Sequence, residues 1–120
     1  MGGFSHAATQ NGWGLRWACD ISQVATVTSN NNFIEAHPVS LDDRSNWHRI
    51  RGTDVITAGF PCQSFSGAGF KEGLNDPRGT VIYHIIEICR AIRPPFLVLE
   101  CVWELFKNPV WRSTATDGFG

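Results

Sequence analysis

Residues 54–66 have the sequence DVITAGFPCQSFS, in which a short apolar run passes directly into small and polar residues. The β-branched, apolar part, 54–58, is typical of a buried strand. The Gly- and Ser-rich part, 59–73, indicates a loop. Cys62 opens this loop, and Pro61 restricts the backbone beside it and helps to aim the thiol. Nearby amides and positive charge lower the pKa of such a thiol, so Cys62 is a candidate nucleophile; a buried structural cysteine is the alternative.

Strand and helix patterns alternate along the whole chain. In 79–92 the apolar residues recur at helical spacing, and Pro94-Pro95 ends that helix. Alternation of this kind predicts an α/β fold with a mostly parallel sheet and right-handed crossovers. The full set of expected elements is helices at 3–11, 22–30 and 79–92, and strands at 14–19, 38–41 (the weakest), 54–58 and 96–99.

Polar groups follow three of these strands. Asp20 follows the first, the loop with Cys62 follows 54–58, and Glu100 follows 96–99. Ligands of open parallel sheets bind outside the carboxyl ends of the strands. The three groups therefore predict a functional site at that edge.

The composition limits the other possibilities. The 120 residues carry a net charge of -1 with ten Lys and Arg, so no basic field indicates a nucleic-acid partner. The four Cys and four His show no zinc spacing, which favours reduced thiols and no metal. No apolar run approaches the ~20 residues that span a bilayer, and no signal peptide is visible. We expect a soluble, cytoplasmic chain whose five tryptophans serve mainly in packing.

The segment 60–66, FPCQSFS, resembles the fourth conserved motif of the cytosine-5 DNA methyltransferases. The resemblance extends over most of the chain: 75–79 (NDPRG) is similar to the fifth motif, 94–102 (PPFLVLECV) to the sixth, and 2–4 (GGF) to the end of the first. It implies a Rossmann-like, S-adenosylmethionine-dependent methyltransferase fold of bacterial or phage type. Residues 1–120 would form a partial catalytic domain, without a target-recognition domain.

The resemblance implies a covalent mechanism. The Cys62 thiolate would add to carbon 6 of cytosine, so that carbon 5 accepts a methyl group. Glu100 matches the family glutamate that contacts ring nitrogen 3, and a solvated strand-end acid is its alternative reading. The target base must first leave the DNA stack.

The methyl donor implied is S-adenosylmethionine. Asp20 occupies the place of an acid that binds the ribose hydroxyls, although it is also placed to cap the helix that begins near Ile21. Asp42, preferred over Asp43, matches an acid near the adenine, and either could instead cap a turn. The other residues that match donor-binding positions are Gly3, Phe4, Pro61 and Val81.

The glycine-containing loop from Ser64 to Gly73 matches the family loop that closes over flipped DNA. Arg78 would order this loop or reach a phosphate, or it is a solvated charge in a turn. The residues expected to act on the substrate from this region are Gln63, Ser64, Ser66 and Arg78.

The chain also departs from the family pattern. The central strand and glycine-rich turn that precede Gly2 in the family are missing, as are the later motifs that bind DNA. Family Glu-Asn-Val is Glu100-Cys101-Val102 here, and a thiol is a weak hydrogen-bond former. We expect the chain to be inactive, or nearly so, alone, and to need a complementing chain to act on double-stranded DNA. The alternatives are a non-catalytic remnant that binds a partner and, less favoured, an RNA cytosine methyltransferase.

Overall fold

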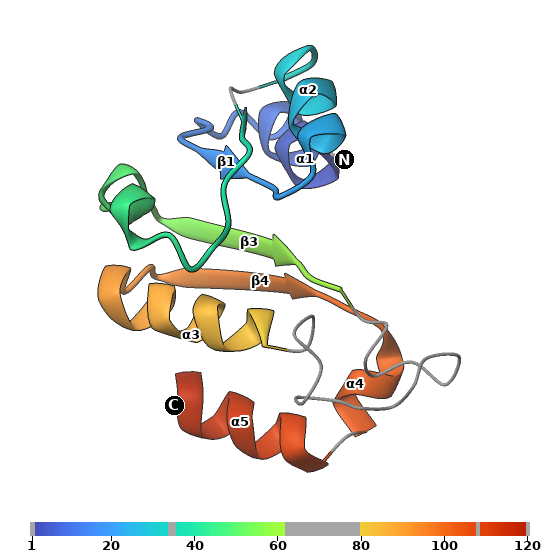
Figure 1. Cartoon of the computed structure of the whole chain (residues 1–120), viewed down its shortest axis with the longest axis vertical. Helices are drawn as coiled ribbons and strands as arrows, with labels where there is room; N and C mark the ends of the chain where they lie inside the picture. The colour runs from blue at the N-terminus through green and yellow to red at the C-terminus, as the bar shows by residue number, and fades with distance from the viewer. Residues whose placement is uncertain (1, 34–35, 62–79, 108, 120) are drawn as a thin grey trace. The chain divides into compact units, whose positions relative to one another are not determined.

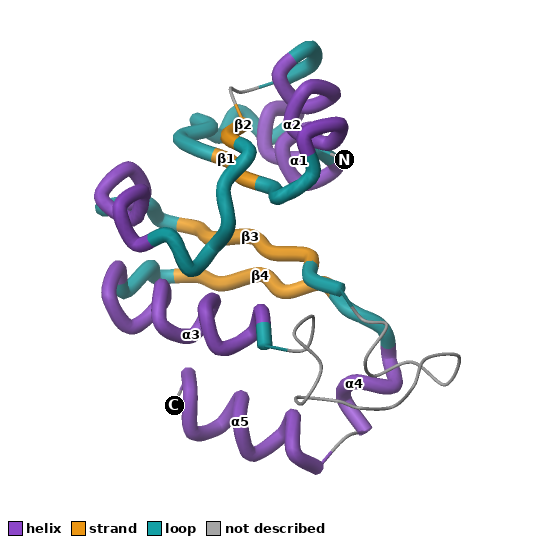
Figure 2. Tube along the Cα trace, viewed as in Figure 1, coloured by secondary structure: helices purple, strands orange, loops and turns teal. Residues whose placement is uncertain are grey.

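The computed structural model describes residues 2–33, 36–61, 80–107 and 109–119, drawn in colour in Figure 1. The chain divides into two compact units, Met1–Thr53 and Asp54–Gly120. Helices and strands alternate as far as β4, and two helices follow it, as Figure 2 shows. The elements are α1 (Gly3–Gln10), β1 (Ala18–Cys19), α2 (Gln23–Asn30), β2 (Ala36–His37), the 3-10 helix η1 (Arg44–Ile50), β3 (Val55–Gly59), α3 (Val81–Ile92), β4 (Phe96–Glu100), α4 (Trp103–Lys107) and α5 (Pro109–Phe119).

The first unit contains a short parallel pair, β1 and β2, with Ala18 opposite Ala36. Local polar contacts define its elements. The Ser22 hydroxyl caps α2 by accepting the Ala25 N–H, and α2 ends at Asn30. The Asn30 amide then accepts the N–H of Ala36 and donates to its carbonyl. The Asn30 amide therefore bonds the backbone of β2, as the backbone of a neighbouring strand would, and so holds β2 at the end of α2.

The second unit contains the parallel pair β3 and β4, in register from Val55–Phe96 to Gly59–Glu100. Residues of α3 lie between these strands in the sequence, which gives a β-α-β order. Four isoleucines on one side of α3 are at most 5% exposed, and they form much of the core of this unit: Ile82, Ile85, Ile86 and Ile88. Helix α3 ends at Ile92, and its C-cap Arg93, directly before Pro94, has a left-handed φ of 53°.

The two faces of the β3–β4 pair differ. In β4, Leu97 and Leu99 are half-buried, whereas Phe96, Val98 and Glu100 are exposed. Phe96 is 66% exposed and Val98 45%. One face of the pair is thus packed and the other presents apolar side chains to solvent.

Most predicted elements are confirmed, with boundaries shifted by one or two residues. The strand expected at 14–19 is only Ala18–Cys19, and the strand expected at 38–41 is wrong. Pairing occurs instead at Ala36–His37 and ends at Pro38, which has no N–H to donate. The patterns missed η1, α4 and α5 entirely. Among the described residues, no helix is long and apolar enough to cross a membrane.

Candidate functional site

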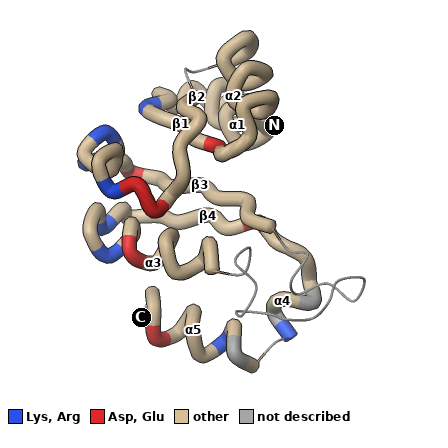
Figure 3. The backbone as a smooth tube through the Cα atoms, viewed as in Figure 1, with Lys and Arg blue, Asp and Glu red and all other residues tan. Residues whose placement is uncertain are grey.

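The carboxyl ends of β3 and β4 lie side by side. Gly59, the last residue of β3, is paired with Glu100, the last residue of β4, and both are exposed. Phe60 and Pro61 continue from β3, and Pro61 is exposed. Figure 3 marks the acid at the end of β4 in red. The structure therefore brings the predicted Glu100 beside the backbone that leads to Cys62.

Several predicted residues fall outside the described residues, so the structure does not place them. They are Cys62, Gln63, Ser64, Ser66 and Arg78.

Val81, predicted to line the donor pocket, is the half-buried first residue of α3. Cys101 follows β4 directly and is half-buried.

Asp20 lies at the carboxyl end of β1. Its N–H donates to the His37 carbonyl at 3.2 Å, which continues the β1–β2 pairing by one bond. Its carboxylate accepts the Ser22 N–H at 2.8 Å. Because Ser22 is the residue that caps α2, Asp20 does not cap the helix itself. The carboxylate is exposed and held in one orientation by the turn.

Gly3 and Phe4 form the first turn of α1, and both are exposed. Gly2 before them has a φ of 81°, and a Cβ there would lie 2.6 Å from the Phe33 ring. A side chain is therefore excluded at Gly2 by both conformation and space. At Gly3, by contrast, nothing lies within 4 Å of the position that a Cβ would take, so the backbone is open there.

The two adjacent acids at 42 and 43 have different roles. Asp43 precedes η1 and accepts hydrogen bonds from the Ser45 hydroxyl at 2.6 Å, the Ser45 N–H at 3.1 Å and the Asn46 amide at 2.8 Å. The Ser45 bonds, with a smaller contribution from Asn46, lower the pKa of Asp43. Asp43 is thus the capping acid, and Asp42 is an exposed residue of the preceding turn.

Cys19 has the properties of a structural thiol. Burial, and secondarily the charge of Asp20, raise its pKa to about 11. A thiol with so high a pKa is protonated and weakly nucleophilic at neutral pH. Nearby, Trp17 stacks on His37 with ring centroids 5.8 Å apart. No group of three His, Cys, Asp or Glu in the described parts of the chain is arranged to hold a metal.

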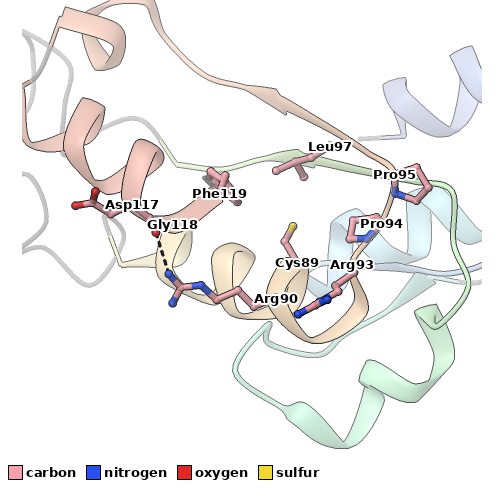
Figure 4. A pocket seen from close by; sticks show the side chains of 9 residues that line it. All are labelled: Cys89, Arg90, Arg93, Pro94, Pro95, Leu97, Asp117, Gly118 and Phe119. Carbon is pink, nitrogen blue, oxygen red and sulfur yellow. Dashed lines mark hydrogen bonds between the residues drawn. The ribbon is translucent and has the colours of Figure 1, made fainter.

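A pocket of about 460 Å³ lies at the opposite end of β4 (Figure 4). Pro94 and Pro95, before β4, line it together with Arg90 and Arg93. Glu100 is the last residue of β4. Because a strand extends by about 3.3 Å per residue, most of the length of β4 lies between the pocket and Glu100. The pocket is therefore not the predicted site.

Sequence patterns missed one contact at the β3 end. Phe60 packs against Trp111 of α5 with ring centroids 6.0 Å apart, and both side chains are buried. Trp111 lies 51 positions from Phe60, in a helix that no periodicity predicted. In the sequence, Trp111 has only one signal, its aromatic character, and the other four tryptophans share that signal.

The predicted residues that the structure describes thus form two sets, one in each unit. Gly3, Phe4, Asp20 and Asp42 belong to Met1–Thr53, and Pro61, Val81 and Glu100 belong to Asp54–Gly120.

Comparison with known proteins identifies the family. The C-5 cytosine-specific DNA methylase profile matches residues 1–114. The type II methyltransferase M1.ScrFI of Lactococcus lactis subsp. cremoris is 46% identical over 103 residues, which are 83% of this chain and 25% of that protein. M.HgiCI of Herpetosiphon aurantiacus is 38% identical over 107 residues (86% and 25%), and M.AluI of Cellulosimicrobium cellulans is 32% identical over 111 residues (88% and 21%).

The chain spans about a quarter of the length of these relatives. Its mixed helices and short parallel strands fit a methyltransferase domain. With the profile matching nearly the whole chain, this protein belongs to the C-5 cytosine-specific DNA methylase family.

Proposed function

We propose that this chain is the donor-binding and nucleophile-bearing part of a DNA (cytosine-5-)-methyltransferase with a Rossmann-like fold. The observation that carries the proposal is the paired end of β3 and β4, where Gly59 is opposite Glu100. Neighbouring strands lie about 5 Å apart. Cys62 follows Gly59 by three residues, so covalent geometry keeps their Cα atoms within about 11 Å. The Cα atoms of Cys62 and Glu100 are therefore at most about 16 Å apart, a separation that two side chains and a cytosine ring can span.

Each group has a separate task in the proposed reaction. The Cys62 sulfur adds to carbon 6 of cytosine, forming a carbon–sulfur bond and turning carbon 5 into an enamine-like nucleophile. The Glu100 carboxyl group hydrogen-bonds ring nitrogen 3 and stabilises the negative charge that the addition places on the ring. After carbon 5 is methylated, its proton is removed and the thiolate is eliminated, which regenerates Cys62.

The described residues of the first unit fit S-adenosylmethionine. The Asp20 carboxylate is exposed, oriented by the Ser22 N–H and able to accept bonds from two ribose hydroxyls. The open backbone at Gly3 allows close approach of the donor's amino-acid part, and Phe4 follows it in the first turn of α1. When bound, the donor supplies an electrophilic methyl group. Asp42 would contact the adenine, and Pro61 and Val81 match donor-binding positions of the family as well.

The substrate is double-stranded DNA, held mainly by parts of a longer protein or by a complementing chain. Phosphate contacts need Lys and Arg, and this chain has only ten. Gln63, Ser64, Ser66 and Arg78 would contact the flipped base and its backbone. We expect little or no methylation by the 120 residues alone.

A chimera tests the proposal. This chain replaces the matching segment of M1.ScrFI, and transfer of tritiated methyl groups to DNA is compared with natural M1.ScrFI. We expect incorporation into DNA that Cys62→Ser abolishes and that Glu100→Gln lowers by about 10²-fold or more. Incorporation that survives Cys62→Ser would exclude the covalent mechanism. A chimera that binds DNA without methylating it would favour the non-catalytic alternative, and preference for transfer RNA would favour an RNA methyltransferase.

A further inference from the structure

Phe60 is held differently from the residues on either side of it. It follows the last paired residue of β3 and is 6% exposed, whereas Gly59 and Pro61 are exposed. Strand pairing ends at Gly59, so it does not fix the chain beyond that point. The buried ring of Phe60 therefore anchors the backbone where it leaves the sheet.

The ring of Trp111 contacts this anchor. The two ring centroids are 6.0 Å apart with an interplanar angle of 36°, and Trp111 is 5% exposed. Tilted aromatic pairs at such distances attract beyond the burial of their surface. Trp111 is therefore placed to restrict the direction in which Phe60 and Pro61 leave β3.

The helix that carries Trp111 is itself fixed on α3. At the far end of α5, a Cβ on Gly118 would lie 2.5 Å from the Ile86 Cδ1 atom, so the helices are close there. Arg90 also donates a hydrogen bond to the Asp117 carbonyl at 3.0 Å. Figure 1 shows α5 beside α3 and running in the same direction. The close packing at Gly118 thus fixes a helix whose first turn carries Trp111, whereas the Arg90 hydrogen bond is exposed and adds little.

We infer that Trp111 is a positioning residue, which acts through Phe60 to hold the end of β3 opposite Glu100 and so directs the approach to the nucleophile. It touches no substrate. The inference rests on the proposed function, because positioning matters only if Cys62 and Glu100 act on one base.

The test uses the chain itself and two local readouts. One is hydrogen exchange of the amides at 58–60, and the other is the alkylation rate of Cys62 by iodoacetamide, measured by peptide mass. A free peptide with the sequence of residues 60–66 gives the alkylation rate of a thiol that no folded structure restricts. Trp111→Leu keeps an apolar side chain but removes the ring contact, Trp111→Phe keeps a ring, and Arg90→Leu perturbs only the far end of α5.

We expect Trp111→Leu to raise exchange at 58–60 by about threefold or more and to move the Cys62 rate toward that of the free peptide. Trp111→Phe should keep both the amide exchange and the Cys62 alkylation rate near those of the natural chain. Arg90→Leu should leave both unchanged. If Trp111→Leu changes neither readout, or if Arg90→Leu has the same effect, the positioning role is wrong. A third outcome is that Cys62 of the natural chain reacts as fast as the free peptide, while exchange still responds to Trp111→Leu. The positioning role of Trp111 would then stand, and the proposed function would be contradicted because its nucleophile is not held in place.

Discussion

The two units are stabilised in different ways. In Met1–Thr53 the described buried residues are small or polar apart from Ile50, namely Ala25, Thr26, Ser29 and Ala36. Side-chain caps and the Asn30–Ala36 pair define its short elements. In Asp54–Gly120 the buried residues are large and apolar, and the two strands pair over five residues.

This difference matches the proposed tasks. Ribose and adenine recognition needs exposed polar groups on turns, which Asp20 and Asp42 provide. The proposed attack on a base needs a thiol and a carboxyl group in fixed relation, and the pairing of β3 with β4 up to Glu100 suits that task. The comparison predicts that mutations in the second unit act through packing and those in the first through hydrogen bonds.

The largest effect is expected from Ile82→Ala. Ile82 is fully buried in the core of the second unit, so the change should lower the free energy of unfolding by about 3–4 kcal/mol. Urea unfolding followed by the loss of helix signal measures it. Ile21→Ala is the matched control, because Ile21 is 79% exposed, and it should cost less than about 0.5 kcal/mol. Equal losses in the two variants would contradict the packing difference.

The next effect depends on pH. The pKa of Cys19 is about 11 in the folded chain against an ordinary value of 9.0. Because the raised value favours the neutral thiol, stability is unaffected below pH 9 and falls as the pH rises toward 11, by about 2 kcal/mol in all. Comparison of urea midpoints at pH 8 and 11 for the natural chain and Cys19→Ala isolates this thiol. A loss of the same size in Cys19→Ala would show that other groups cause it.

A smaller effect is expected from Asn30→Ala in the first unit. The change removes both hydrogen bonds to the Ala36 backbone and should cost about 1–2 kcal/mol. Hydrogen exchange at 36 and 37 should rise accordingly. Asn32→Ala removes one exposed bond to the Thr28 carbonyl and serves as the control. If the control raises exchange equally, Asn30 has no special role in holding β2.

The smallest effect concerns Asp43. Its pKa lies below the ordinary 3.8 because of its bonds from Ser45 and Asn46. A lowered carboxyl pKa contributes stability at neutral pH that is lost as the pH falls through the folded value. The amide signal of Ser45, followed by NMR from pH 7 to pH 2, should therefore shift with a midpoint below 3.8. Asp43→Asn should abolish the transition, and a midpoint at or above the ordinary value would argue against the cap.

The sequence alone was sufficient to predict the parts with strong local patterns. The helical spacing of isoleucines predicted α3, and the apolar runs before Gly59 and Glu100 predicted β3 and β4. The resemblance of residues 60–66, 75–79 and 94–102 to successive family motifs predicted the family, and the profile match confirmed it. These features depend on residues that are close in the chain, so composition and periodicity reveal them.

Tertiary structure decided the contacts between distant residues. The register that places Gly59 opposite Glu100 has no local signal, and neither has the packing of Phe60 on Trp111. Strand boundaries in the first unit likewise depended on where Asn30 found backbone partners, and so the strand expected at 38–41 was wrong. Such contacts form only when the folded chain brings distant side chains together, and no sequence window contains both members of the pair.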